Sequence, residues 1–466
     1  MIHLRRRIVL AAVGWLVTRI PMYLLMTGHL GHTLNKYGKD SRGDVSLYWT
    51  WVHTDLNHLV LPAVSTWQYP PLVGPLLMLP QAMPGSNYTS QFIHLAFLAD
   101  AVTIALLIWT ATRRGSWYGA WYWIAGVPLL GPLIYGRFDV FSALPVVAAL
   151  ALLGLGVPRT DGKLGRQLNN RCWIAGVLIG LGAALKVWPG LALFGLPRTR
   201  RGLETAVAAV AGGGAATLLT MAAFKNGTGF LKSQGGRGVE IESVWAVPFL
   251  LLKHLGLASV RVKWQYGSFE LLGHGVGVVE VLALFTTVLA FAALSYWWLV
   301  KDWRPAVVAD ATLVGTLLMI VTSRVISPQY MIWLLGVAAF CLMFKDTSQR
   351  RAALILLISL PLSQADFPHY FYGLVHGRST PALVVAARDV LLVVAAGVGF
   401  ADLWRSTVTG PVLPWRRQWR GPRSGAVAAA GTTADAAIPG PAGEQDQEPS
   451  ADGEAHGDPV PAGTAV

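Results

Sequence analysis

The sequence predicts an all-α, polytopic membrane protein. Of its 466 residues, 54% are hydrophobic and only 13% are charged. Apolar runs of roughly twenty residues, the length of a helix that crosses a bilayer, recur along most of the chain. Lys and Arg residues gather in short clusters between these runs, as they do in the cytoplasmic loops of membrane proteins. Together these observations indicate a bundle of membrane-spanning helices.

The length criterion gives about twelve apolar segments. Two of them are short and share the break "LKVWPG", where Pro189 ends one helix and permits the next, and where Lys186 lies at the tip of a hairpin. In chain order, the segments cover residues 8–28, 91–112, 117–135, 139–157, 171–186, 188–197, 203–223, 276–300, 306–322, 328–344, 351–367 and 381–404.

The basic clusters predict the orientation of the chain. Placing them all in the cytoplasm puts both termini on the cytoplasmic side; they are Arg5 to Arg7, Arg113 and Arg114, Arg159 to Arg171, Arg198 to Arg201, Lys301 to Arg304, Lys345 to Arg351 and Arg405 to Arg423. The segments left outside are 29–90, 136–139, the Lys186 tip, 224–275, 323–330 and 366–380. Five prolines interrupt the apolar run within 29–90, which favours interfacial or re-entrant helices there over a clean span.

The chain divides into a membrane domain, residues 1–405, and a cytoplasmic tail, residues 406–466, that is first basic and then acidic. Residues 424–466 contain no Lys or Arg and are rich in Ala, Gly, Pro and acid, so we expect this tail to be disordered. The net charge of +13 fits loops that face anionic lipid better than a nucleic-acid surface. The two cysteines, Cys172 and Cys341, indicate neither a disulfide framework nor a thiol metal site.

Most of the unusual polar residues fall in the outer segments, and their order is informative. Asp44 is followed by "QYPPL", "GRFDVFSALP", "AGVLIGLGAALKVWPGLAL", "GRGVEIESVW" and "SRVISPQYMIWLL". Over roughly residues 5–405, this series resembles glycosyltransferase family 87, whose studied members are α-mannosyltransferases of the GT-C fold that use polyprenol-phosphate-mannose. The resemblance implies a GT-C membrane glycosyltransferase that moves a hexose, mannose in the studied members, onto a lipid-linked or cell-envelope glycan.

A lipid-phosphate sugar carries its own good leaving group, so such an enzyme needs a base for the acceptor hydroxyl and positive charge for the phosphate. Attack from the face opposite the phosphate inverts the anomeric carbon. The resemblance implies that the base is a carboxylate of the first outer loop, and Asp44 matches that position. Asp40 and Asp55 are nearby competitors, and a solvated loop carboxylate or a helix cap is the alternative for Asp44 itself.

The remaining outer polar residues are candidates for substrate binding, each with a structural alternative. Arg137 and Asp139 would pair with each other at a helix start, Lys186 would extend its ammonium to water, and the "GRGVEIES" segment would be a solvated face. Arg324 would bind the phosphate of ordinary lipids, and His369 would anchor its loop at the membrane interface. The full set of candidates is Tyr69, Arg137, Asp139, Lys186, Arg237, Glu240, Glu242, Arg324, Gln329 and His369.

Four charged residues fall inside apolar segments, where an unpaired charge is costly. They are Arg19, Asp100, Arg388 and Asp389. We expect structural ion pairs between helices at these positions.

The predicted partners are a polyprenyl-phosphate sugar donor, a glycolipid or envelope glycan acceptor, and the lipids of a bacterial plasma membrane, with the active site on the extracytoplasmic side. We expect no cofactor and no nucleic acid, and no pattern indicates a divalent cation. A transporter or lipid flippase is the alternative. It would place charges near the bilayer midplane in both halves of the chain, and the break at Lys186 is the one feature that fits it.

The predicted topology can be tested with impermeant thiol reagents. Cysteines introduced at Lys39 and Gly235 should react in intact cells, because the basic clusters place residues 29–90 and 224–275 outside. Reaction only after lysis would overturn the assignment of the outer face.

Overall fold

The structure is a computed structural model that describes residues 2–63, 66–85, 87–154, 163–231 and 236–409, without the side chains of residues 163–169. The predicted tail from residue 410 onward lies outside the described residues. The first half of the chain forms α1 (Ile2–Thr27), α2 (His32–Ser41), α3 (Gly43–Thr54), η1 (Leu56–His58), α4 (Val73–Ala82), α5 (Tyr88–Arg114), α6 (Tyr118–Leu130), η2 (Pro132–Tyr135), α7 (Asp139–Gly154), α8 (Lys163–Leu185), η3 (Trp188–Gly195) and α9 (Arg200–Ala223).

The second half begins with a small sheet and ends with long helices. Its elements are β1 (Val239–Glu240), α11 (Val247–His254), β2 (Val260–Gln265), β3 (Ser268–Gly273), α12 (Val276–Val300), α13 (Ala306–Thr322), α14 (Tyr330–Cys341), α15 (Arg350–Gln364), the π-helical turn η4 (Ala365–Tyr370), α16 (Phe371–Val375) and α17 (Ser379–Thr407).

The helical architecture confirms the predicted membrane protein. Every predicted apolar run overlaps a helical segment, although 188–197 forms the 3₁₀-helix η3. Among the described residues, 5 helices (α1, α5, α9, α12 and α17) are long and apolar enough to cross a membrane. Further apolar helices of 10–17 residues lie beside them, so the count of about twelve spans remains a prediction. The prolines of 58–90 leave only short helices there, as expected.

A three-stranded sheet of order β1-β3-β2 is an addition to the predicted all-helical fold. The strands β2 and β3 form an antiparallel hairpin in which Gln265 pairs with Ser268. Tyr266 and Gly267 form the turn, and both have positive φ, 49° and 69°, as the tightest hairpin turns require. Buried and more exposed residues alternate along part of the stretch "VRVKWQYGSFELL". Alternation of this kind is typical of a strand and not of a helix.

The interior of the bundle contains the expected ion pair between Arg19 and Asp100. The Arg19 Nε atom lies 3.0 Å from Asp100 Oδ2, and both side chains are fully buried. Asp100 also accepts hydrogen bonds from Trp123 Nε1 at 2.6 Å and from the Tyr135 hydroxyl at 2.7 Å. Because the charge is paired and hydrogen-bonded, this site ties α1, α5 and α6 together and has a structural role.

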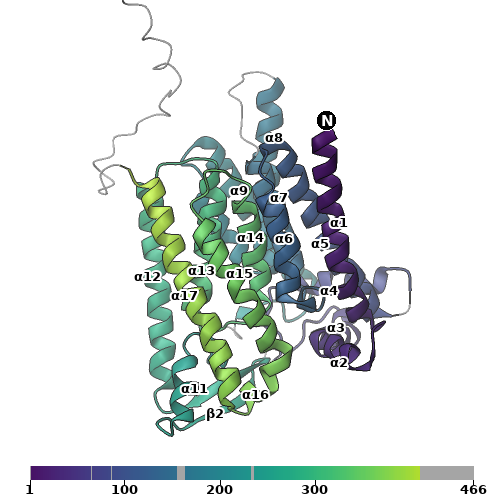
Figure 1. The fold of residues 1–466 in the computed structure, drawn as a ribbon, viewed down its shortest axis with the longest axis vertical. Helices are drawn as coiled ribbons and strands as arrows, with labels where there is room; N and C mark the ends of the chain where they lie inside the picture. Colours follow the sequence, from purple (N-terminus) through teal and green to yellow (C-terminus); the bar gives the residue numbers. More distant parts are fainter. Residues whose placement is uncertain (1, 64–65, 86, 155–162, 232–235, 410–466) are drawn as a thin grey trace, which may run out of the picture. The chain divides into compact units, whose positions relative to one another are not determined.

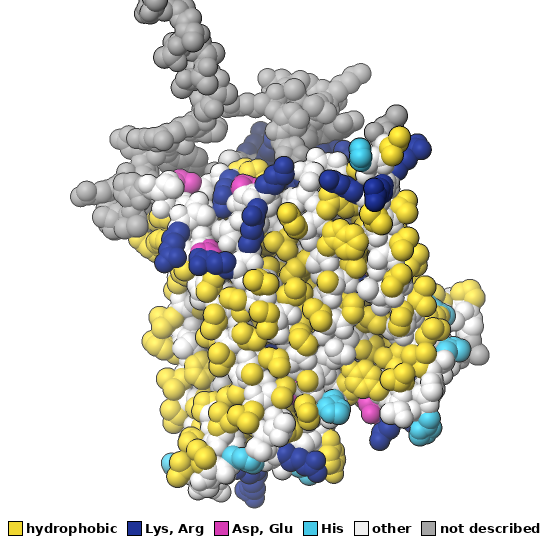
Figure 2. Space-filling view, viewed as in Figure 1, with side chains coloured by type: hydrophobic (Ala, Val, Ile, Leu, Met, Phe, Trp, Pro, Cys, Tyr) yellow, Lys and Arg dark blue, Asp and Glu magenta, His cyan; other side chains and the backbone are white. Residues whose placement is uncertain are grey.

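The elements that carry the candidate site meet at one end of the bundle. In Figure 1, α2, α3, α11, α16 and β2 lie at the lower end, opposite the N-terminus of α1. Figure 2 shows Lys and Arg side chains gathered over the upper end and a broad hydrophobic surface between the two ends. This distribution fits a bilayer around the middle of the bundle, with the basic clusters at one face and the candidate site at the other.

Candidate active site at one end of the bundle

Asp44 forms an ion pair with Arg137. The carboxylate lies in the first turn of α3, where the helix dipole favours a negative charge. Arg137 Nε lies 3.0 Å from Asp44 Oδ2, and the two side chains are 5% and 36% exposed, respectively. Within the described residues, Asp44 Oδ1 accepts no hydrogen bond. The geometry therefore leaves an accessible, oriented carboxylate oxygen beside a buried cation.

The backbone at Gly136 allows this pair to form. A Cβ atom at Gly136 would lie 2.4 Å from the carbonyl oxygen of Ser41, so only glycine lets the link between η2 and α7 approach the end of α2 this closely. Arg137 Nη1 donates to the carbonyl oxygens of Gly136 at 3.1 Å and of Ser41 at 3.5 Å. These contacts fix the guanidinium next to the start of α3.

Asp139 pairs with Lys186 and not with Arg137, so the structural alternative considered for Arg137 and Asp139 is wrong. Lys186 Nζ lies 3.2 Å from Asp139 Oδ1, with side-chain exposures of 13% and 1%. Trp333 Nε1 donates to the same oxygen at 2.9 Å. Asp139 is the first residue of α7, and Lys186 follows the last residue of α8. The end of α8 before Pro189 therefore places the ammonium beside the carboxylate at the start of α7.

Aromatic rings surround the Lys186 ammonium. Its Nζ atom lies 5.0–5.3 Å from the ring centroids of Tyr69, Phe138, Tyr330 and Trp333. Cation–π contacts of this kind hold a cation more strongly where water is limited. With one carboxylate and four rings around it, Lys186 is held in place and is not extended into solvent.

Tyr69 lies between the two ion pairs. Its ring packs against those of Trp67 at 5.6 Å and Phe138 at 4.8 Å. Burial raises the pKa of the Tyr69 phenol well above its usual value, and the negative charges of Asp44 and Asp139 raise it further. The Tyr69 hydroxyl therefore stays protonated beside the two carboxylates. It can both donate and accept a hydrogen bond.

A second polar group lies on the other side of Tyr330. It contains Arg237, whose Nη2 donates to Ser268 Oγ at 3.3 Å, and Glu240, which accepts from Ser327 Oγ at 3.4 Å. Glu240 is directly opposite Glu270 in the sheet. Burial raises the pKa of Glu240 to about 7, with Arg237 lowering it and Glu270 raising it. The small sheet thus brings one cation and two carboxyl groups to the edge of the site.

Glu242 faces a buried group formed by Asp366, Arg388 and Asp389. Arg388 Nη1 lies 2.8 Å from Asp366 Oδ2 and 3.9 Å from Glu242 Oε1. Burial raises the pKa of Glu242 well above its usual value, and the charge of Asp366 adds to this effect. The expected ion pairing between elements is confirmed for Arg388, which pairs with Asp366 of η4, whereas Asp389 pairs at 2.9 Å with its neighbour Arg388 in the same helix.

Three candidates lie outside these contacts. Arg324 and Gln329 are half-buried in the link before α14, and their side chains make no hydrogen bond or ion pair within the described part of the chain. His369 is exposed, and its ring packs on that of Tyr370 at 4.5 Å. The competitors of Asp44 are also apart from the ion pairs, because Asp40 is exposed in α2 and Asp55 precedes η1.

Several residues of the site escaped the sequence analysis. Phe138 lies between two candidates in the sequence, and Tyr330 and Trp333 are three residues apart at the start of α14, so helical spacing could have grouped the latter two on one face. Neither Asp366 nor Glu270 belongs to a sequence motif. Both come from segments that reach the site only through the tertiary fold.

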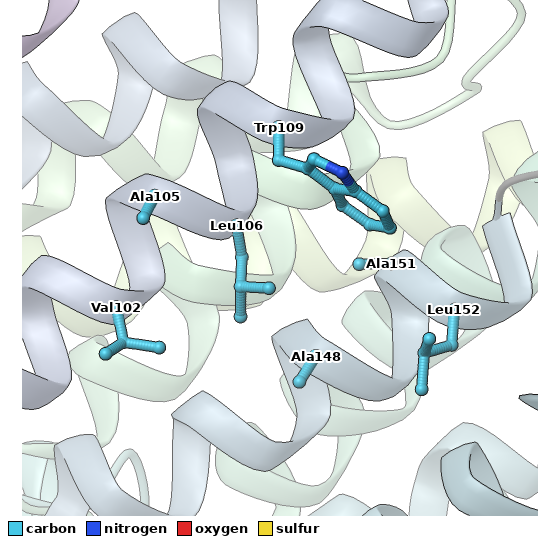
Figure 3. Close-up of a pocket in the computed structure, with 7 residues that line it drawn as sticks. All are labelled: Val102, Ala105, Leu106, Trp109, Ala148, Ala151 and Leu152. Atoms are coloured by element: carbon cyan, nitrogen blue, oxygen red, sulfur yellow. The ribbon is translucent and has the colours of Figure 1, made fainter.

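Across the described residues, no set of three or more His, Cys, Asp or Glu side chains is arranged to hold a metal ion. A groove of about 520 Å³ lies between α5 and α7, away from the ion pairs. Figure 3 shows its apolar lining, which consists of Val102, Ala105, Leu106, Trp109, Ala148, Ala151 and Leu152. Since it has no charged or hydroxyl side chain, this groove lacks the groups that group transfer requires.

Comparison with known proteins gives a family match and two structural similarities. The sequence model described as glycosyltransferase family 87 matches residues 67–328, which is more than half of the chain. The solved structure of ArnT from Cupriavidus metallidurans bound to undecaprenyl phosphate is similar with a TM-score of 0.42 and 14% identity, covering 86% of this chain and 76% of that one. The apo structure of the same protein gives 0.42 and 13%, with coverage of 85% and 77%. No curated protein sequence matches the chain.

The raised pKa of Glu240 predicts a loss of stability with rising pH. The folded state keeps this proton up to about pH 7, whereas the unfolded chain releases it near pH 4.5. Between these values each pH unit lowers the free energy of unfolding by about 1.4 kcal/mol for this group, a few kcal/mol in total. Glu240→Gln, which is neutral at every pH, should flatten the fall in the midpoint of thermal unfolding between pH 5 and 7. Glu204→Gln is the matched control, and an equal slope in Glu240→Gln and the native protein would contradict the prediction.

Proposed function

This chain belongs to glycosyltransferase family 87, and we propose that it moves mannose from a polyprenyl-phosphate donor to a lipid-linked or cell-envelope glycan, with inversion at the anomeric carbon. As a member of the family it is a membrane glycosyltransferase. The choice of sugar, donor and acceptor belongs to the proposal and rests on the resemblance described above. We place the reaction on the extracytoplasmic side of the plasma membrane, with both termini in the cytoplasm.

The observation that carries the proposal is the accessible carboxylate of Asp44 beside buried cations. The paired oxygen faces Arg137 at 3.0 Å, and the side chain is 36% exposed. In the proposed reaction the other oxygen accepts the proton of the acceptor hydroxyl while that hydroxyl oxygen bonds to the anomeric carbon. The bond from that carbon to the phosphate oxygen breaks, and polyprenyl phosphate leaves with the electron pair. One carboxylate is enough for this chemistry.

We assign the donor phosphate to Lys186. Its ammonium has three N–H donors, and Asp139 accepts at 3.2 Å. The aromatic rings keep the group in a poorly solvated position, where its attraction for developing phosphate charge is strong. Asp139 is 1% exposed, so we assign it to holding Lys186 in place. Arg237 is the second candidate for the phosphate.

We assign sugar recognition to the polar groups around Tyr330. Glu240 Oε2, Glu242 Oε1 and Arg237 Nε have no hydrogen-bond partner within the described structure. Sugar hydroxyls donate and accept at the same time, so they match a mixture of carboxyl and guanidinium groups. The aromatic faces of Tyr69 and Tyr330 supply the apolar contact that sugar rings also need.

The alternative, a transporter or lipid flippase, finds little support. Asp44, Arg137, Asp139 and Lys186 lie together at one end of the bundle, whereas alternating access requires a site near the bilayer midplane. The charges found deeper in the bundle, Arg19 and Asp100, are paired with each other.

The function can be tested with membranes that contain the protein. Membranes given labelled polyprenyl-phosphate mannose should produce a new labelled glycolipid, and membranes from cells that lack the protein should not. Transfer from a nucleotide sugar alone, in the absence of any polyprenyl-phosphate sugar, would overturn the proposed donor.

Asp44→Asn should abolish most of the activity. The substitution keeps the size of the side chain but removes its basicity, so turnover should fall by about two to four orders of magnitude, the usual effect of losing a general base. Insertion and donor binding should remain.

Asp40→Asn and Asp55→Asn are the matched controls for this experiment. Both residues lie near Asp44 in the sequence but outside its ion pair, so these variants should retain most of their turnover. Full activity in Asp44→Asn with loss in either control would place the base elsewhere in the loop. Full activity in all three variants would remove the main support for the mechanism.

Lys186→Met should weaken use of the donor. Loss of one charge-assisted donor at a preorganised site lowers kcat/KM by about a hundred- to a thousandfold. The measurement is the initial rate at subsaturating donor, with Lys39→Met, which changes an exposed lysine of α2, as the control. Arg237→Gln tests the second candidate in the same assay. Native rates in both Lys186→Met and Arg237→Gln would show that neither side chain binds the phosphate.

A further inference from the structure

Arg388 joins three segments at the outer end of the bundle. It lies in α17 and is fully buried. Its guanidinium contacts Asp366 of η4 at 2.8 Å, Asp389 at 2.9 Å and Glu242 of the segment after β1 at 3.9 Å. It also donates to the backbone carbonyl oxygen of Glu242. Removing one partner of a buried charge strongly destabilises the folded protein. These contacts therefore fix η4 against α17.

One guanidinium cannot neutralise three ionised carboxylates. Burial, followed by the charge of Asp366, raises the pKa of Glu242 well above its usual value. Burial and this neighbouring charge therefore favour the neutral form of the Glu242 carboxyl group. Asp366 is held in the cluster by its ion pair with Arg388, at 2.8 Å.

The residue after Asp366 touches the catalytic region. Phe367 leaves the helical conformation, with φ −121° and ψ 128°, which turns the chain out of α15 at this point. Its ring centroid lies 5.0 Å from Cζ of Arg137, a cation–π contact on the face of the guanidinium. Arg137 in turn pairs with Asp44.

The end of α15, directly before η4, contacts the helix before Asp44. Gln364, the last residue of α15, donates from Nε2 to the hydroxyl of Tyr37 in α2 at 3.3 Å. Gln364 also lies against Gly131, where a Cβ atom would be 2.8 Å from Nε2 and would displace it. The turn η4 therefore lies between the buried Arg388 cluster and the segment that carries the base.

We propose that Asp366, Arg388 and Phe367 are positioning residues, which hold the guanidinium of Arg137 and thereby orient Asp44. This inference rests on the proposed function, because it gives these residues a role in presenting the catalytic base. Phe367 closes one face of the guanidinium, and the backbone of Gly136 accepts from it. With that face open, the flexible Arg137 side chain reaches other rotamers, and Asp44 loses its fixed direction toward the acceptor hydroxyl.

Substitutions at Phe367 test the proposal. Phe367→Leu removes the ring and keeps an apolar side chain, so kcat should fall by about 3- to 30-fold, the rate equivalent of one cation–π contact. The KM for donor should stay within error of the native value, and the protein should remain folded, with a small decrease in the midpoint of thermal unfolding because the ring contacts with Arg137 and Phe371 are lost. Phe367→Tyr keeps the ring and should retain the native kcat. Tyr372→Leu, which removes an exposed ring of α16 that stacks on His376, is the control and should also be unaffected.

A structural measurement separates this inference from the proposed function. In a cryo-electron microscopy structure of Phe367→Leu, the Arg137 guanidinium should have moved away from Asp44. An intact Arg137–Asp44 pair in that variant, or a native kcat in an assay where the native protein is active, overturns the positioning role. A native protein that transfers no sugar overturns the proposed function, and the structure of the variant still decides the positioning of Arg137.

Asp366→Asn extends the test to the buried cluster. The amide removes the ion pair that holds η4 to Arg388, although Asp389 still neutralises the guanidinium, so kcat should fall at least as far as in Phe367→Leu. Native kcat in folded Asp366→Asn would show that the cluster does not act on the base.

Discussion

The site depends on three consecutive residues at the start of α7. Arg137 and Asp139 have opposite charges, yet each pairs with a residue from another segment, Asp44 at 3.0 Å and Lys186 at 3.2 Å. Phe138 between them packs on Tyr69 and contributes to the enclosure of the ammonium. The start of one helix therefore fixes both the proposed base and the proposed phosphate ligand.

The membrane explains why the polar groups are paired in this way. Charges near a bilayer are costly when they are unpaired, so the inner charges, Arg19 and Asp100, satisfy each other. At the outer end the pairing is less complete, since Asp44 is 36% exposed and Lys186 is 13% exposed. Incomplete pairing is what a reactive site needs, because a fully satisfied carboxylate has no oxygen left for a substrate proton.

Periodicity in the sequence was sufficient to predict the helices, because their length follows from bilayer thickness, whereas the assignment of segments to the outer side stays a prediction from the distribution of Lys and Arg. Periodicity and charge also grouped Asp44, Arg137, Asp139 and Lys186 as candidates. They could not predict which cation pairs with which carboxylate, since that depends on the close approach at Gly136 and on the helix break at Lys186. The small sheet was missed because its strands are short and the prediction was made for apolar runs. Asp366 was missed because its partner, Arg388, is 22 residues away in another helix.

The acidic residues around the site would seem unfavourable for an anionic donor. Glu240, Glu242 and Asp366 lie close to the cations, and three ionised carboxylates would repel a phosphate. Burial removes much of this conflict, because it raises the pKa of Glu240 to about 7 and raises that of Glu242 well above its usual value. A neutral carboxyl group keeps its hydrogen-bonding capacity without the charge, so it can contact sugar hydroxyls and still allow phosphate nearby. In the proposed site, this partial neutralisation leaves Lys186 and Arg237 as the positive charges available to the donor phosphate.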